Sequence, residues 1–211
     1  AAEKGLRNIN STFCPDAGVW EWEEWSKFLN RAYRAHHELK EKRAGEGTDL
    51  HELAEQWIGT CLKENAGKPI EPFLIDPKLK QFVDWCLINV KRFLFSEIHC
   101  YSERLWVGGK TDFGYEDLNG NHVLADIKSR DKDYFSDHAQ CGGYDIQLYE
   151  CGGLDKDGNE TMIFKKRFGK HAIFTLGNNF KEPIFSKPEE NRKAFEHALG
   201  LYKLKQAYES K

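Results

Sequence analysis

Residues 107–129 have the sequence VGGKTDFGYEDLNGNHVLADIKS, in which two strand-like stretches flank Asn119-Gly120. Asn-Gly between alternating apolar residues is a strong signal for a β-hairpin. A two-residue loop would place Asp112 and Asp126 on opposite faces of the sheet, whereas a three-residue loop would place them opposite each other on one face. Three-residue loops end on a residue with positive φ, which Gly120 adopts without strain. The sequence therefore favours the three-residue loop.

Asp126 and Lys128 lie two residues apart in a stretch that otherwise predicts a buried strand. Alternate strand residues share a face, so in the three-residue register Asp112, Asp126 and Lys128 project from the same side. Carboxylates about 5 Å apart across two strands repel each other. A divalent cation between them would reverse that repulsion, and hard cations such as Mg²⁺ and Mn²⁺ prefer oxygen ligands. The alternative is an edge strand that carries a surface salt bridge.

The rest of the chain predicts helices on both sides of a small mixed sheet. Apolar residues at helical spacing indicate helices at residues 18–43, 49–64, 77–95, 134–150 and 187–209. Strand-like alternation indicates strands at residues 96–106, 107–117, 122–129, 161–167 and 171–177, with a turn at 155–160. We expect an α/β (α+β) fold in one domain over residues 1–211. Its expected parts are a helical part (about 18–95), a sheet core (about 96–180) and a closing helix (about 188–209).

Composition and charge narrow the class of protein. The chain is 40% hydrophobic and 31% charged with a formal net charge of -3, so contact with a polyanion requires a local basic patch or bound cations. No apolar run approaches the roughly 20 residues that span a bilayer, and the N-terminal residues lack the apolar core of a signal peptide. The six cysteines include no C-x-x-C pair and predict free thiols in a reducing compartment. We expect a cytoplasmic protein that does not contact a membrane.

Four short motifs follow one another in an order that resembles the PD-(D/E)xK nuclease superfamily, in particular its RecB-type and phage lambda exonuclease-like branch. The matching segments are Gly47–His51 (G-T-x-x-H), Gly109–Asp112 (G-x-x-D), Asp126–Lys128 (D-x-K) and Gln140–Tyr144 (Q-x-x-x-Y). Thr111 departs from the Pro of the superfamily's name. The four cysteines that hold an iron–sulfur cluster in some relatives have no counterpart here, so we expect no cluster.

The resemblance implies a restriction-endonuclease-like core and a metal site. Its ligands would be His51, Asp112, Asp126 and the Ile127 carbonyl, and its ion Mg²⁺ or Mn²⁺. Because imidazole nitrogen suits Mn²⁺ better than Mg²⁺, His51 inclines the expectation toward manganese. Lys128 would help to generate and direct the attacking hydroxide or steady the charge of the attacked phosphate.

A further carboxylate is expected at this site. Glu97, fifteen residues before Asp112, matches a glutamate common at that place in the family. The resemblance implies that it supports the metal ligands without binding the first metal, or that it is a ligand of a second metal. Glu103 competes with Glu97 for this role.

Gln140 and Tyr144 are one helical turn apart and share a helix face. Gln140 would orient the nucleophilic water or bind a phosphate, with plain packing as the alternative. Gly142 and Gly143 are poor helix residues and predict a close approach of this helix to the sheet or to DNA. Tyr144 and a local phosphate-binding groove would contact the nucleic acid, and the candidate groove residues are Lys110, Arg130, Lys132, Lys165, Lys166, Arg167 and Lys170.

Together these features predict an enzyme, a divalent-metal-dependent deoxyribonuclease. The resemblance implies an exonuclease that processes the ends of linear DNA in phage recombination or DNA repair, in the host-cell cytoplasm if phage-encoded. It is compatible with a homo-oligomer or with a recombination partner protein. The alternatives are a catalytically silent DNA-binding or assembly subunit of the same fold and an RNA-directed enzyme.

Overall fold

The structure is a computed structural model that describes residues 50–154, 160–162, 164, 166–177, 180 and 182–210. All of them belong to one compact unit, Gly47–Lys211. The helix predicted at residues 18–43, the N-terminal part of the predicted single domain, Lys165 and most of the turn predicted at 155–160 lie outside the described residues.

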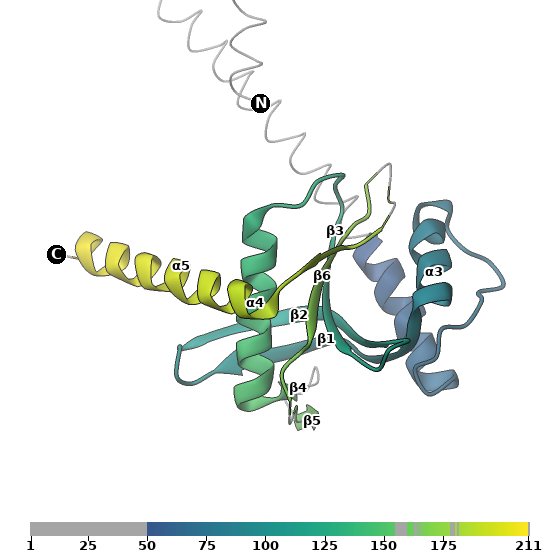
Figure 1. Ribbon diagram of the computed structural model, residues 1–211, viewed down its shortest axis with the longest axis horizontal. Helices are drawn as coiled ribbons and strands as arrows, with labels where there is room; N and C mark the ends of the chain where they lie inside the picture. The colour runs from purple at the N-terminus through teal and green to yellow at the C-terminus, as the bar shows by residue number, and fades with distance from the viewer. Residues whose placement is uncertain are drawn as a thin grey trace, which may run out of the picture. The chain divides into compact units, whose positions relative to one another are not determined.

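The described residues form a seven-stranded sheet with the strand order β5-β4-β1-β2-β3-β6-β7 (Figure 1). The strands are β1 (Val90–Ser102), β2 (Val107–Asp117), β3 (His122–Lys128), β4 (Gly153–Leu154), β5 (Glu160–Met162), β6 (Lys170–Thr175) and β7 (Ile184–Ser186). β3 and β6 are parallel, and all other neighbouring strands are antiparallel. The sheet is therefore mixed, as predicted.

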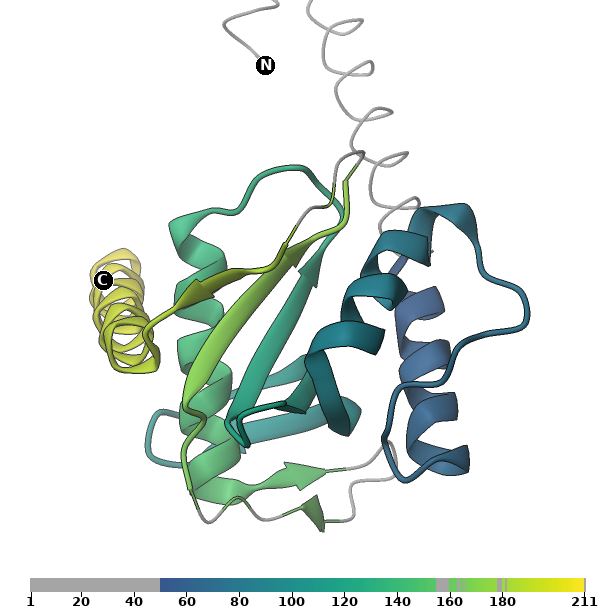
Figure 2. The same cartoon turned by 45° about the vertical axis from the view of Figure 1, so that its right-hand side comes forward.

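Helices cover both faces of this sheet (Figures 1 and 2). The helix at residues 50–64 and α3 (Pro77–Asn89) lie on one face, and α4 (Phe135–Cys151) lies on the other. α5 (Pro188–Glu209) packs against α4. This arrangement confirms the predicted α/β (α+β) class and the helices predicted at 49–64, 134–150 and 187–209, to within a residue or two at each end.

The two faces of the sheet carry separate apolar cores. On the α3 side the rings of Phe82, Phe113 and Phe174 meet edge to face or tilted, with centroids 5.3–5.9 Å apart. On the α4 side a smaller cluster includes Leu124 and Leu148. Successive β3 residues alternate between these cores, which identifies the face toward which each β3 side chain points.

The predicted helix at 77–95 is wrong at its end, because α3 stops at Asn89 and β1 begins at Val90. Apolar residues continue at helical spacing across this boundary, so the sequence pattern conceals it. Within β1 a register shift separates Phe93, which packs on the α3 side, from Phe95, which packs on the α4 side. Such a bulge turns neighbouring side chains to opposite faces, and the strand then loses its simple period of two.

Two further differences concern short strands. The strand predicted at 161–167 is described only as β5, Glu160–Met162, and residues 166 and 167 lie outside any strand. No pattern in the sequence predicts β4 or β7, which are two and three residues long and too short to show a period.

The β2–β3 hairpin has the three-residue loop that the sequence favours. Asp117 N donates to Asn121 O at 2.9 Å, and Gly120 N donates to Asp117 O at 3.0 Å. Gly120 has a φ of 81°, which a side chain would strain. The paired residues run from Glu116↔His122 to Phe113↔Ala125, so the predicted register is confirmed.

Two predictions from composition concern membrane spans and cysteines. Among the described helices none is long and apolar enough to cross a bilayer. The five described cysteines, Cys61, Cys86, Cys100, Cys141 and Cys151, are free thiols as predicted, and Cys14 lies outside the described residues.

Candidate active site

Asp112 and Asp126 lie where β2 and β3 separate. The ladder between these strands ends at Phe113↔Ala125, and beyond it β2 stays paired with β1 while β3 stays paired with β6. Asp112 Oδ2 accepts a hydrogen bond from Ile127 N at 2.6 Å. The carboxylate thus replaces the backbone acceptor that the opposite strand no longer supplies. Both carboxylates are held at this fork in the sheet.

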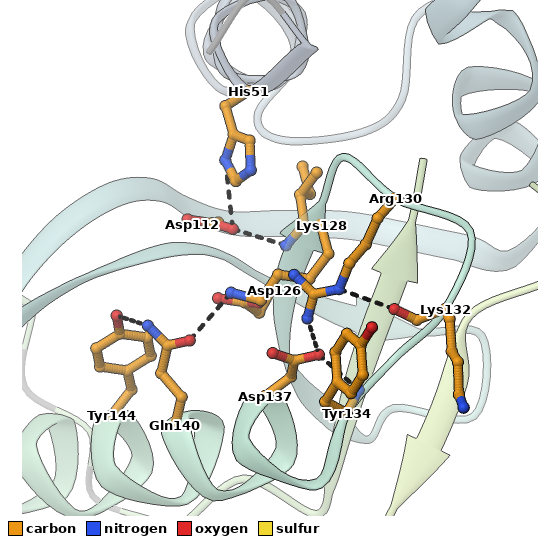
Figure 3. Close-up of polar contacts among 11 residues, drawn as sticks. His51, Asp112, Asp126, Lys128, Arg130, Lys132, Tyr134, Asp137, Gln140 and Tyr144 are labelled. Atoms are coloured by element: carbon orange, nitrogen blue, oxygen red, sulfur yellow. Dashed lines mark hydrogen bonds and ion pairs between the residues drawn. The ribbon is translucent and has the colours of Figure 1, made fainter. Parts of the chain in front are cut away.

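A chain of polar contacts links β3 to α4. Lys128 Nζ lies 2.6 Å from Asp126 Oδ2 and donates to Gln140 Oε1 at 3.0 Å. Gln140 Nε2 in turn donates to the Tyr144 hydroxyl at 2.7 Å (Figure 3). Asp126 and Lys128 therefore point toward α4, and Gln140 and Tyr144 share one helix face, as the sequence predicts.

Gly109 on β2 makes room for the last member of this chain. A Cβ at Gly109 would come 2.6 Å from Tyr144 Cε1, closer than carbon atoms approach. Any larger residue at this position would push the ring away from β2. Close packing against Tyr144 thus explains the glycine of the G-x-x-D motif in this chain.

His51 reaches the fork from the helix at 50–64, on the other side from α4 (Figure 3). Its Nδ1 lies 3.6 Å from Asp112 Oδ2. Burial lowers the pKa of His51, although the charge of Asp126 and a hydrogen bond to the Ile127 backbone act in the opposite direction. The lowered pKa favours the neutral ring, which is the form that binds metal ions.

The two carboxylates are electrostatically unfavourable as placed. Burial raises the pKa of Asp112 to about 6, although the hydrogen bond from the Ile127 N–H and the charge of Lys128 both act to lower it. Burial also raises the pKa of Asp126 to about 7, and the charge of Asp112 adds to this rise. Lys128 alone does not compensate both carboxylates. Such paired, strongly shifted groups are typical of functional sites.

The donor chemistry of the fork fits a hard divalent ion, but its ligands are not gathered around one point. Among the described residues, no three His, Cys, Asp or Glu side chains are close enough to hold a common ion. Lys128 lies against Asp126, and Ile127 N–H occupies Asp112 Oδ2. Yet Asp126 Oδ2 is buried and accepts no well-directed hydrogen bond from the described residues. Two carboxylates and the Ile127 carbonyl form the oxygen set that Mg²⁺ or Mn²⁺ prefers.

Glu97, rather than its competitor Glu103, belongs to this site. The charge of Glu97 raises the pKa of Asp112, whereas Glu103 lies in the exposed turn between β1 and β2. Glu97 also has a φ of 43°, which costs a non-glycine residue free energy. The Glu97 carboxylate forms an ion pair with Lys110. The Lys110 ammonium, which the sequence predicts to contact nucleic acid, is therefore already engaged by Glu97.

Several basic side chains of the predicted phosphate-binding groove are engaged by neighbouring groups. Arg130 forms an ion pair with Asp137, and Lys170 pairs with Asp117 at the opposite end of β2 from Lys110. Arg167 lies over the Tyr149 ring, 4.2 Å from its centroid. These basic side chains stabilise separate parts of the fold. The sequence does not reveal these contacts, because the partners lie on other elements of the fold, from seven positions away for Arg130 to 53 for Lys170.

The two glycines of α4 face α5 rather than the sheet or DNA, which corrects the interpretation from the sequence. A Cβ at Gly142 would come 2.2 Å from the Asn191 carbonyl oxygen, and one at Gly143 would come 2.5 Å from the Phe195 ring. The close approach is real, but the partner is a helix more than forty residues later in the chain. Helix α4 is thereby held between the sheet and α5.

Sequence reasoning missed a buried polar network beneath α5. Asp145 is fully buried, forms an ion pair with Arg192 and lies 3.4 Å from His171 Nε2. Asn191 contacts the other ring nitrogen of His171 at 2.9 Å. These residues come from α4, β6 and α5, so no local motif signals them. The network fixes α5 to α4 and so supports the helix that carries Gln140.

Two comparisons with known proteins concern similarity at the level of sequence. The chain matches no model of a known protein family, and a search of curated proteins also finds no match. The assignment of the site therefore depends on its residues and their geometry.

Proposed function

We propose that the protein is a divalent-metal-dependent deoxyribonuclease that hydrolyses phosphodiester bonds at the fork between β2 and β3. The observation that carries the proposal is the position of Asp112 and Asp126 together at this fork, where the charge of Asp112 raises the pKa of Asp126 and Lys128 Nζ lies 2.6 Å from Asp126 Oδ2. A buried and a half-buried carboxylate can hold a hard cation, and the ammonium beside them can stabilise the charge that develops during phosphodiester hydrolysis.

Each residue has a role that follows from its contacts. Asp112, Asp126 and the Ile127 carbonyl would hold the ion, with His51 completing the set. A divalent ion there would act as a Lewis acid and would lower the pKa of attacking water. Lys128, kept in place by Gln140, carries a positive charge that stabilises the negative charge developing on the attacked phosphate. Tyr144 holds Gln140 from the other side.

We also propose that the substrate is the end of linear DNA, as the resemblance to exonucleases of phage recombination and DNA repair implies. The negative net charge of the chain is compatible with this proposal, because bound cations rather than a basic surface would meet the scissile phosphate. Mg²⁺ or Mn²⁺ would be the cofactor.

The test is digestion of end-labelled linear and circular DNA by the full chain with Mg²⁺ or Mn²⁺. Asp126→Ala and Lys128→Ala should each reduce cleavage by at least about 100-fold, the usual cost of removing one group that stabilises a transition state. Matched controls are Asp84→Ala and Lys80→Ala, which break an exposed ion pair of the same length, 2.6 Å, on α3. Both control variants should cleave at the wild-type rate.

Full activity of Asp126→Ala or Lys128→Ala would show that the site is misassigned. A protein that binds DNA without a divalent ion and never cleaves it would instead be the silent binding subunit. Cleavage of circular DNA at the same rate as linear DNA would exclude the end-processing form of the proposal.

A further inference from the structure

Two exposed aromatic side chains follow the fork directly along the chain. Tyr134 is 53% exposed and Phe135 is 76% exposed, and Phe135 is the first residue of α4. Burying an aromatic ring is favourable, so adjacent exposed rings often mark a binding surface. We call Tyr134 and Phe135 the aromatic platform.

The Tyr134 ring is held in place by cationic neighbours. The Arg130 guanidinium lies 4.8 Å from the ring centroid, and Lys132 Nζ lies 5.9 Å from it (Figure 3). Arg130 is itself fixed by Asp137 and donates to the Lys132 carbonyl at 2.8 Å. The Tyr134 backbone N–H also donates to Asp137, at 2.8 Å. Tyr134 is therefore positioned by the fold itself, which reduces the entropic cost of binding at this residue.

The acidic side chains beside the platform are paired inward. Asp133 lies 2.8 Å from His138 Nε2, and Asp137 is engaged by Arg130. The exposed Lys132 ammonium remains beside the ring. An aromatic surface with adjacent positive charge is complementary to a nucleic-acid strand, whose bases stack and whose phosphates are negative.

The platform lies close to the fork. Arg130 contacts Asp137, Lys128 contacts Gln140, and these two α4 residues are three positions apart on one helix face. The separation between the two contacts is thus about one helical turn, roughly 5 Å. A base on the platform would lie about one to three nucleotides from a phosphate at Lys128, because stacked bases repeat every 3.4 Å or so.

We propose that the aromatic platform stacks unpaired bases of a single DNA strand and leads that strand to the fork. The preferred substrate end is therefore single-stranded or frayed, because the faces of bases within a duplex are already stacked on each other. The substrate role of the platform rests on the proposed nuclease function, whereas its binding of a DNA strand does not.

The test is binding of a fluorescent single-stranded DNA oligonucleotide to the full chain without divalent ions, so that no cleavage occurs. Tyr134→Ala should weaken binding about fivefold or more, since stacking of one base contributes about 1–3 kcal/mol, the lower limit of which is about fivefold in affinity. Tyr134→Phe, which keeps the ring, should bind like the wild type. The control Tyr208→Ala removes a tyrosine that is 81% exposed on α5 and should change nothing. Lys132→Ala should make the binding constant less dependent on salt concentration, by the amount expected for the loss of about one phosphate contact.

Equal binding by Tyr134→Ala and the wild type would overturn the platform, even if the protein digests DNA. Tyr134-dependent binding without any cleavage in Mg²⁺ or Mn²⁺ would support the platform and overturn the nuclease. Tighter, Tyr134-dependent binding of RNA of the same sequence would overturn the assignment to DNA. A change of oligomeric state in Tyr134→Ala would identify the platform as a contact between copies of the chain and overturn the proposal.

Discussion

Replacing Asp126 with asparagine should stabilise the protein while it removes the proposed activity. The Asp126 side chain is almost fully buried beside Asp112, and its pKa rises from 3.8 to about 7. A shift of this size means that the fold disfavours the ionised carboxylate by about 4 kcal/mol. Asparagine has nearly the same shape and no charge. Because some relaxation accompanies ionisation, we expect Asp126→Asn to raise the free energy of unfolding by about 2–4 kcal/mol near pH 8.

The gain should depend on pH in a defined way. The folded-state pKa of Asp126 is raised, so its contribution to stability is fully present below its unfolded pKa of 3.8 and is lost as the pH rises through about 7. The advantage of Asp126→Asn should therefore vanish near pH 4 and reach its full size near pH 8.

The assay is urea unfolding of the metal-free full chain at several pH values between these limits. Asp84→Asn, at an exposed carboxylate on α3, is the matched control and should show no such gain. Added Mn²⁺ should then stabilise the wild type, because an ion that binds only the folded state raises its stability, and should not stabilise Asp126→Asn. A loss of stability in metal-free Asp126→Asn near pH 8 would refute the claim that the buried charge is unfavourable.

Two further predictions concern packing around α4. Arg192→Ala should lower the free energy of unfolding by about 3–5 kcal/mol, because it leaves the fully buried Asp145 without its cation. Thermal or urea unfolding measures this, and a loss below about 1 kcal/mol would contradict the buried ion pair. Gly109→Ala should cost about 1–3 kcal/mol and reduce any cleavage, because its Cβ would meet Tyr144 at 2.6 Å. Gly59→Ala, a helical position with open space around it, should instead stabilise the protein by up to about 1 kcal/mol in the same measurement.

The β2–β3 hairpin shows how far local sequence can lead. The loop length and Gly120 set the register, and the register brings Asp112 and Asp126 to the same end of the ladder, one residue beyond Phe113↔Ala125. Alternation along β3 then brings Lys128 to the same face. These inferences hold because turn geometry and the two-residue period of a strand depend on residues only a few positions apart.

Other features depend on residues that meet only in the folded chain. The start of β1 is concealed because apolar residues keep a helical spacing from α3 into the strand, and only the partner strand reveals the bulge. Gly142 and Gly143 indicate a close contact, but their sequence does not identify α5 as the partner.

The charged residues show the same division. Contacts between distant parts of the chain decide which basic side chains are paired by carboxylates. They also bury Asp145 beside Arg192. Local sequence was thus enough to predict the hairpin, its register and the shared face of Asp126 and Lys128, because these follow from turn geometry and backbone periodicity. The surroundings of each of those groups could not be predicted in this way, because burial and charge pairing depend on elements that pack from other parts of the chain.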